Sequence, residues 1–286
     1  MDLLLIAGVS GSGKSVTIAA VEDTGYYGVS NLPVPQLAGL LAHLKTARQE
    51  HVAIVLDVKT EPGVAGIAEA IEAARGDGWT VRFLYLDAKT DTLVKRFSET
   101  RRRHPFSNHQ RTLTEAIEFE RERLADARPL GYCFDTSDLS AAALRRWIKD
   151  FISVDPSKLT LLFQSFGYKH GVPLDADLVF DVRCLPNPHY EPELAAKSGV
   201  DPDVIDYLQR QPESERMYSD IYHFVASWLP DYARDNRNYL TVAIGCTGGR
   251  HRSVYLVERL AKAFAGRYQV LTRHREFDDL TESRLP

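Results

Sequence analysis

Short apolar runs alternate with longer amphipathic stretches through the first half of the chain. Each run is long enough for one buried strand, and three are evident: Leu3–Gly8, Val52–Asp57 and Val81–Asp87. The stretches around them are predicted to be helical: Ser15–Asp23, Val64–Ala74, Ser98–Leu124 with a break at Pro105, and Ala143–Ile152. Continuous apolar strands between helices are typical of a parallel sheet covered by helices on both faces.

A polar segment, Ser153–Lys158, contains a proline and shows no periodicity, so it predicts a linker. The alternation then resumes. Strands are predicted at Leu159–Phe166, Asp177–Arg183, Tyr239–Gly245 and Tyr268–His274, and a helix at Ser253–Phe264. The pattern therefore predicts two α/β domains, at residues 1–153 and 157–286.

Composition excludes several classes of protein. The 286 residues are 44% hydrophobic and 26% charged, which is ordinary for a soluble protein, and the net charge of -4 excludes a globally basic nucleic-acid binder. Cys133, Cys184 and Cys246 form no C-x-x-C pair, which argues against a disulfide framework or zinc site and suits a reducing cytoplasm. No apolar run approaches the ~20 residues of a membrane helix, and the N-terminus is predicted to be a buried strand rather than a signal peptide.

The first apolar run leads into the phosphate-binding pattern G-x-x-x-x-G-K-S, followed by a predicted helix. Its backbone N–H groups would surround phosphate oxygens, with the lysine on the β- and γ-phosphates and the serine on Mg²⁺. We therefore predict binding of ATP or GTP; the alternative is a glycine-rich turn without a ligand. The residues of this P-loop are Gly8, Val9, Ser10, Gly11, Ser12, Gly13, Lys14 and Ser15.

Nucleotide hydrolysis also needs an acid at the end of a neighbouring strand. Asp57 is the first candidate for this acid and for a second metal ligand beside Ser15, and Asp87 is the other. Either carboxylate could instead only cap a turn, so binding is better supported than turnover. A basic run, with Lys95, Arg96 and the arginines at 101–103, could stabilise a transferring phosphoryl group, or could be a solvated helix face.

A second glycine-rich loop follows the predicted strand Tyr239–Gly245 and also opens a helix. Its spacing, C-x-x-x-x-x-R-S, is that of a cysteine-phosphatase loop, in which the arginine fork holds phosphate and the thiolate attacks it. No general acid stands out, because nothing in the local sequence singles out Asp181 or Asp201. A phosphatase, a non-reactive phosphate site and a structural turn remain open. The loop comprises Cys246, Thr247, Gly248, Gly249, Arg250, His251, Arg252 and Ser253.

The surroundings of this loop are basic. Seven Lys or Arg residues lie between Ile244 and Arg275, opposed only by Glu258, which gives a segment of charge +6. Such a segment predicts a polyanion-binding face, or else a helix face with solvated charges. Pro186 and Pro188 would also fix a turn that aims His189 towards a phosphate or a sugar hydroxyl, although a lone histidine is more often structural.

Four stretches together resemble the RapZ/YvcJ family of bacterial nucleotide-binding proteins: 8–15, 25–33, 165–190 and 239–254. The resemblance spans nearly the whole chain. It implies an N-terminal kinase-like P-loop domain that binds ATP and GTP, with GTP assigned to Asp57, Val58, Lys59 and Thr60, and with at most weak ATPase or GTPase activity. It implies a C-terminal α/β domain of phosphofructokinase-like fold.

The resemblance also implies partners. Enterobacterial members bind regulatory small RNAs and glucosamine-6-phosphate, present the RNA to endoribonuclease E, and assemble as tetramers. By motif match the anion site would include His189, Thr247, Gly248, His251 and Arg252. Two departures matter. Ser30 stands where the family usually carries an aspartate, and the tail Glu276–Pro286 has a charge of -3 where enterobacterial members end in a basic run.

These observations predict a cytoplasmic, oligomeric regulatory protein with a nucleotide site in one domain. The other domain is predicted to bind RNA and a phosphorylated metabolite. The rival predictions are a small-molecule kinase that uses the P-loop and a cysteine phosphatase that uses Cys246.

Overall fold

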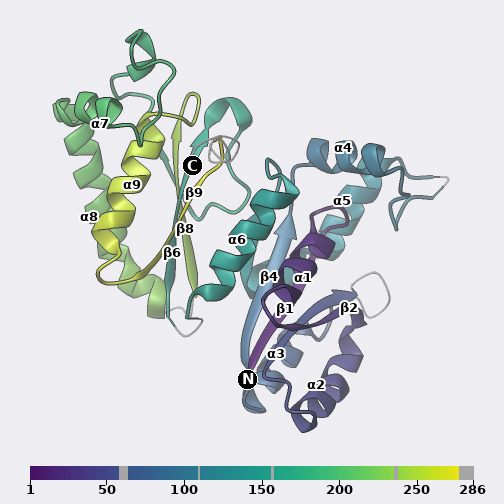
Figure 1. Cartoon of the computed structure of the whole chain (residues 1–286). Helices are drawn as coiled ribbons and strands as arrows, with labels where there is room; N and C mark the ends of the chain where they lie inside the picture. Colours follow the sequence, from purple (N-terminus) through teal and green to yellow (C-terminus); the bar gives the residue numbers. More distant parts are fainter. Residues whose placement is uncertain (58–63, 109, 156–157, 235–237, 277–286) are drawn as a thin grey trace. The chain divides into compact units, whose positions relative to one another are not determined.

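The computed structural model describes residues 1–57, 64–108, 110–155, 158–234 and 238–276. The chain divides into two compact units, Met1–Pro156 and Ser157–Pro286, each built on its own parallel sheet (Figure 1). The predicted α/β class is therefore confirmed. In the part of the chain that the structure describes, we find no helix that combines the length and the apolar character needed to cross a membrane.

The first unit follows the predicted alternation of strands and helices. Its sheet has the strand order β2-β3-β1-β4-β5, and every neighbouring pair is parallel. Its elements are β1 (Asp2–Gly8), α1 (Lys14–Glu22), β2 (Tyr27–Pro33), η1 (Val34–Gln36), α2 (Leu37–Thr46), β3 (His51–Asp57), α3 (Ile67–Gly76), β4 (Thr80–Asp87), α4 (Thr90–Thr100), α5 (Leu113–Arg123), η2 (Ala125–Leu130), β5 (Tyr132–Asp135) and α6 (Ala141–Ser153).

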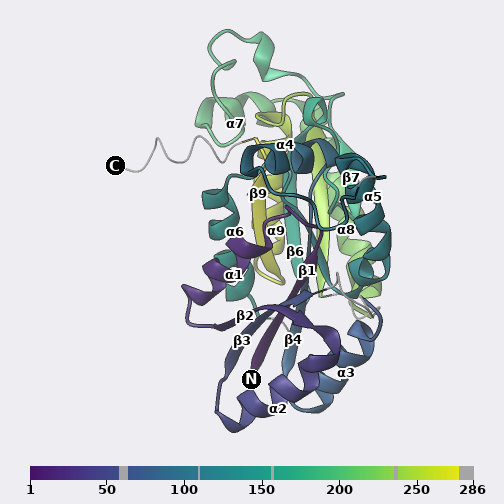
Figure 2. The same cartoon turned by 90° about the vertical axis from the view of Figure 1, so that its right-hand side faces the viewer.

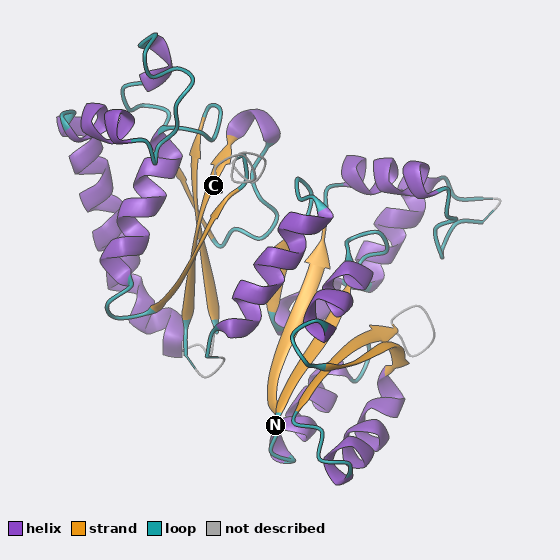
Figure 3. Cartoon of the chain, in the orientation of Figure 1, coloured by secondary structure: helices purple, strands orange, loops and turns teal. Residues whose placement is uncertain are grey.

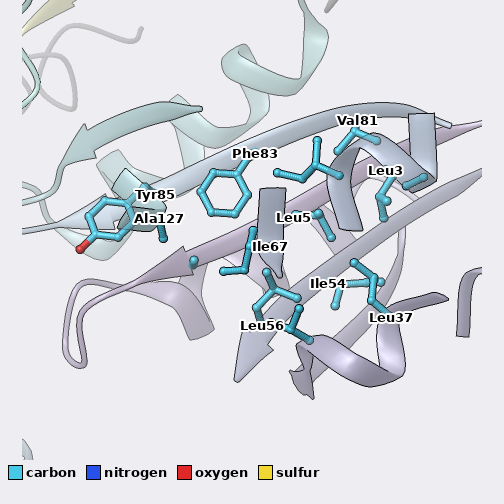
Figure 4. Packing of buried hydrophobic residues seen from close by; sticks show 14 of the residues in the cluster. Leu3, Leu5, Leu37, Ile54, Leu56, Ile67, Val81, Phe83, Tyr85 and Ala127 are labelled. Carbon is cyan, nitrogen blue, oxygen red and sulfur yellow. The ribbon is translucent and has the colours of Figure 1, made fainter. Parts of the chain in front are cut away.

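Both faces of this sheet are buried, because successive side chains of a strand point to opposite faces. Leu3 and Leu5 of β1 pack with Ile54 and Phe83 of the neighbouring strands against α2 and α3 (Figure 4). The helices α1 and α6 pack together on the other face, as Figures 1 and 2 show. Because all strands are parallel, their carboxyl ends lie at the same end of the sheet. The loop after the central strand β1 lies in the middle of this end.

The second unit has the strand order β7-β8-β6-β9, again all parallel. Side chains of β6 and β8 form one core with the helices α7, α8 and α9, which lie beside the sheet in Figure 3. Its elements are β6 (Thr160–Gly167), η3 (Tyr168–His170), β7 (Leu178–Asp181), η4 (Pro188–Tyr190), α7 (Pro202–Gln209), α8 (Pro212–Arg234), β8 (Tyr239–Cys246), α9 (Arg252–Phe264) and β9 (Gln269–His274).

The predicted strands and helices are found within a few residues of their expected bounds, with one substantial difference. The charged stretch Ser98–Leu124 is not one interrupted helix: α4 ends at Thr100 and α5 starts at Leu113. Thr112 begins α5 by accepting the N–H of Glu115, whose carboxylate accepts the N–H of Thr112 in return. The long connection between the helices contains Pro105.

Gly131, just before β5, tests how tightly the first unit is packed. A Cβ atom there would lie 2.2 Å from the carbonyl oxygen of Phe83. We expect Gly131→Ala to lower the free energy of unfolding of this unit by about 1–3 kcal/mol, because the backbone at Phe83 or at residue 131 must move to make room for the methyl group. Urea unfolding would measure it. Gly76→Ala is the control, since no atom lies within 4 Å of its Cβ position; equal stability of the two variants would contradict the packing argument.

Candidate functional site

The P-loop backbone has a positive φ, which favours glycine, at all three of its glycines, Gly8, Gly11 and Gly13. Gly8 has φ 138°, and a Cβ atom on it would lie 2.1 Å from the carbonyl oxygen of Leu86 on β4. Gly13, at the start of α1, has φ 103°. The loop is also anchored to β4 by the N–H of Val9, which donates to Leu86 at 3.2 Å. The predicted glycine pattern therefore reflects a turn that passes very close to the sheet.

Lys14 is held by the loop itself. Its Nζ donates to the carbonyl oxygens of Gly8 at 2.6 Å and of Val9 at 2.8 Å. These contacts keep the ammonium group beside the loop, within reach of any phosphate bound there. Ser15, the predicted magnesium ligand, lines the cavity that opens over the loop.

A cavity of about 610 Å³ opens over the P-loop. Its lining combines backbone of the P-loop, cationic side chains and apolar side chains. The loop lines it together with Ser30 and Asn31 of β2, Val55 of β3, residues of α1, the basic run and the start of α6. The lining residues are Ser10, Gly11, Gly13, Lys14, Ser15, Val16, Ile18, Ser30, Asn31, Val55, Arg96, Phe97, Thr100, Arg102, Arg103, Pro105, Leu139, Ser140, Ala141 and Leu144.

Three arginines of the predicted basic run belong to this cavity: Arg96, Arg102 and Arg103. Arg96 donates to the carbonyl oxygen of Gly11 at 3.0 Å and to that of Thr136 at 2.6 Å. Burial lowers the pKa of its guanidinium, which the carboxylates of Asp135 and Glu99 partly offset. Lys95 instead lies 4.0 Å from Glu99 on the exposed face of α4. Some cations of the basic run therefore line the cavity, and others, such as Lys95, lie on the solvated face of α4.

The two candidate acids differ in their surroundings. Asp57 ends β3 and is partly buried, whereas Asp87 is fully buried and pairs with Arg121 at 3.3 Å and Arg128 at 3.1 Å. Of the described residues, neither acid is among those that line the cavity. Val58, Lys59 and Thr60, predicted to bind GTP, lie outside the described residues.

Metal binding at this site would depend on the nucleotide. Within the described ranges, no three His, Cys, Asp or Glu side chains are grouped to hold a metal ion. Mg²⁺ usually takes one or two protein ligands and completes its shell with substrate phosphates and water. The Ser15 hydroxyl fits such a partial site.

Glu120 is a P-loop partner that the sequence did not reveal. This carboxylate of α5 is 1% exposed and accepts the N–H of Ser10 at 2.7 Å and its hydroxyl at 2.8 Å. His104, also buried, lies 3.0 Å away through Nε2, while its Nδ1 accepts the N–H of Phe106. Nε2 therefore carries the proton and donates to Glu120. No local motif marks a contact that joins residues 110 positions apart.

The pKa of Glu120 reflects opposing effects. Burial raises it, but the hydrogen bond from His104, the charge of Lys14 and the two hydrogen bonds from Ser10 outweigh burial and place it below its usual value. The folded unit therefore favours the charged carboxylate over the protonated one.

In the second unit, the Cys246 loop encloses its own sulfur. The Sγ atom of Cys246 accepts the N–H of Gly249 at 3.2 Å and lies 3.2 Å from the hydroxyl of Ser253. Cys246 is only 2% exposed. These contacts tie the start of the loop to Gly249 and to Ser253 at its end.

The other residues of this predicted site converge on the segment 183–194. Arg252 donates through Nη1 to the carbonyl oxygens of Arg183 at 2.8 Å and Leu185 at 2.9 Å, and through Nη2 to the hydroxyl of Thr247 at 3.2 Å. His251 lies 3.2 Å from the carbonyl oxygen of Leu194, and burial lowers the pKa of its imidazole.

His189 belongs to the same cluster, because its ring centre lies 6.4 Å from that of His251. The predicted anion residues His189, Thr247, His251 and Arg252 are thus brought together. The guanidinium nitrogens Nη1 and Nη2 of Arg252 are thus bonded to acceptors of the protein itself.

Two arginines of the loop have buried donors without a hydrogen-bond partner among the described residues. These donors are the Nε–H groups of Arg250 and Arg252. A buried donor without a partner costs free energy, which an anionic ligand or an ordered water would recover.

The basic segment is less exposed than its sequence suggests. Arg252, Arg273 and Arg275 are at most 5% exposed. Arg273 pairs with buried Asp175 at 3.4 Å, and Arg259 pairs with Glu215 at 2.8 Å. The segment therefore does not form a face of seven solvated cations, because distant parts of the unit supply carbonyl and carboxylate partners for most of them.

Comparison with known proteins identifies the family. Residues 1–156 match the model of the RapZ-like N-terminal domain, and residues 159–278 match that of the RapZ C-terminal domain. The chain belongs to the RapZ family. The resemblance inferred from the motifs is thereby confirmed.

Relatives of high identity cover almost the whole chain. A nucleotide-binding protein of Thiobacillus denitrificans is 56% identical over 276 residues, which cover 96% of this RapZ-family chain and 99% of that protein. A nucleotide-binding protein of Azoarcus sp. is 55% identical, with coverage of 96% and 94%. Among solved structures, a shikimate kinase from Bacteroides thetaiotaomicron matches with a TM-score of 0.35 and 14% identity, over 53% of this chain and 98% of that one.

Glu120→Gln tests the charge beside the P-loop. Because the pKa of Glu120 is lowered on folding, its charge stabilises the folded unit above the unfolded pKa, and this stability is lost as pH falls through the folded value. We expect the variant to be about 1–3 kcal/mol less stable than the native chain at pH 7 and to lose less stability towards pH 3. Urea unfolding across pH would measure this. Glu118→Gln, on the exposed side of α5, is the control. Parallel pH profiles for Glu120→Gln and the native chain would refute the assignment.

Proposed function

We propose that the N-terminal unit binds ATP or GTP with Mg²⁺ through the P-loop. The observation that carries this proposal is the cavity of about 610 Å³, which places loop backbone, Lys14 and three arginines around one space. The close relatives named nucleotide-binding proteins support it.

Binding would proceed by exchange of partners. Lys14 would turn from the carbonyl oxygens of Gly8 and Val9 to the β- and γ-phosphates, and the loop N–H groups would donate to phosphate oxygens. Arg102 and Arg103, which also line the cavity, would add positive charge. The apolar side chains of Leu139 and Leu144 offer a surface on which the base can pack.

Turnover is supported less well than binding. Asp87 is engaged by two arginines, and Ser30 lines the cavity where the family usually carries an aspartate. A water or an acceptor hydroxyl would therefore lack an evident base, and we propose at most weak ATP or GTP hydrolysis. A small-molecule kinase would instead release ADP only when its acceptor is added, and Lys14→Ala would abolish that release.

For the C-terminal unit we propose binding of a small phosphorylated metabolite, such as the amino-sugar phosphate glucosamine-6-phosphate. The unpartnered Nε–H groups of Arg250 and Arg252 support this site, together with His189 and Thr247 nearby. The same unit would bind structured RNA and present it to a nuclease such as endoribonuclease E, as the family resemblance implies. Lys262 and Arg267 are exposed cations of this unit that would contact RNA phosphates.

Lys14→Ala tests the nucleotide site. We expect it to weaken ATP and GTP binding at least tenfold, because it removes the cation nearest the β- and γ-phosphates. Calorimetry with a non-hydrolysable analogue and Mg²⁺ would measure the change. Lys149→Ala removes an exposed charge of α6 and should bind as the native chain does. Undiminished binding by Lys14→Ala would show that the P-loop is not the nucleotide site.

A double variant tests the RNA surface. We expect Lys262→Ala with Arg267→Ala to weaken binding of a structured RNA and to reduce the salt slope by about two, one for each lost phosphate contact. Fluorescence anisotropy across a salt series would measure both quantities. The control pair is Arg145→Ala with Lys149→Ala, two exposed cations of α6. An unchanged slope would place RNA, if it binds, elsewhere.

A further inference from the structure

A carboxylate of this chain lies against the Cys246 loop. Glu276 lies in the turn that follows β9, and its Oε1 accepts the N–H of Gly167 at 3.0 Å. Gly249 has no room for a side chain here, since a Cβ atom would lie 2.2 Å from Glu276 Oε2. Oε2 is buried and has no hydrogen-bond partner among the described residues.

The chain just before Glu276 is held firmly. His274 lies 2.9 Å from the hydroxyl of Ser165 and 2.9 Å from the carboxylate of Glu258 on α9. The N–H of Arg275 donates to the carbonyl oxygen of Ser165 at 3.2 Å. Glu276 therefore approaches the loop from a fixed point beside β6.

The loop and the end of β6 form one continuous backbone surface there. Gly167 lies opposite Cys246 in the sheet, and a Cβ atom on Gly167 would lie 2.8 Å from the carbonyl carbon of Gly248. The carboxylate thus occupies the edge of the same glycine-rich surface that would receive an anion. It offers that surface negative charge before any ligand arrives.

We propose that Glu276 determines the affinity and charge selectivity of the Cys246 loop. Its carboxylate lowers the affinity of the loop for anions and disfavours dianions more than monoanions. The inference rests on the proposed anion site of the C-terminal unit. Repulsion between two charges scales with their product, and solvent and salt screen it only weakly when one charge is buried. The carboxylate of Glu276, with only Oε1 hydrogen-bonded, thus repels an anion that approaches the loop, whereas the cations Arg250 and Arg252 attract it.

The test compares two ligands of nearly the same shape, glucose 6-phosphate and glucose 6-sulfate. At pH 8 the phosphate ester is a dianion and the sulfate ester a monoanion. In calorimetry with the full chain at low ionic strength, we expect Glu276→Gln to bind the phosphate ester about tenfold more tightly and the sulfate ester about threefold more tightly. Glu276→Asp keeps the charge and should retain weak binding.

Glu213→Gln is the matched control, because it removes an exposed carboxylate from the first turn of α8 in the same unit. It should leave both affinities unchanged. Equal affinities of the native chain and Glu276→Gln for both esters would overturn the role of Glu276 while leaving the anion site intact. Absence of binding by every variant would overturn the anion site as well, so the two failures are distinguishable.

Discussion

The close approach of Gly8 to the Leu86 carbonyl is the constraint on which the N-terminal unit depends. The chain leaves the sheet at that point, and the first residues of α1 line the cavity. A parallel sheet places such a turn at the carboxyl edge, beside the turns of its neighbours. The C-terminal unit repeats this arrangement at the end of β8, where the loop closes around the sulfur of Cys246.

Much of the fold could be predicted because buried strands in parallel sheets are continuous apolar runs. The pattern of apolar runs identified β1, β3, β4, β6, β7, β8 and β9. It missed β2, an edge strand whose residues are mostly exposed or partly buried and whose register shifts between Val29 and Leu32. It also missed β5, which has only four residues. Neither strand carries a pattern long enough to stand out from its surroundings.

The candidate site was predictable where its chemistry is local and unpredictable where it is not. The P-loop is eight consecutive residues, and the arginines of the basic run lie on the helix beside it. Glu120 reaches Ser10 across 110 positions, and Asp175 reaches Arg273 across 98. Such long-range pairings bury most cations of the predicted basic segment in contacts within the unit, and they place the carboxylate of Glu120 beside the P-loop motif.

The self-contained bonding of Lys14 has a kinetic consequence. The P-loop is held by contacts within its own unit, because Lys14 bonds to the loop carbonyls and Glu120 holds the amide of Ser10. A nucleotide that arrives meets a shaped surface and needs only to replace existing hydrogen bonds, so little ordering entropy is lost at the loop. Association would then be governed by diffusion and by the attraction of the arginines, and differences among nucleotides would appear chiefly in how long each remains bound.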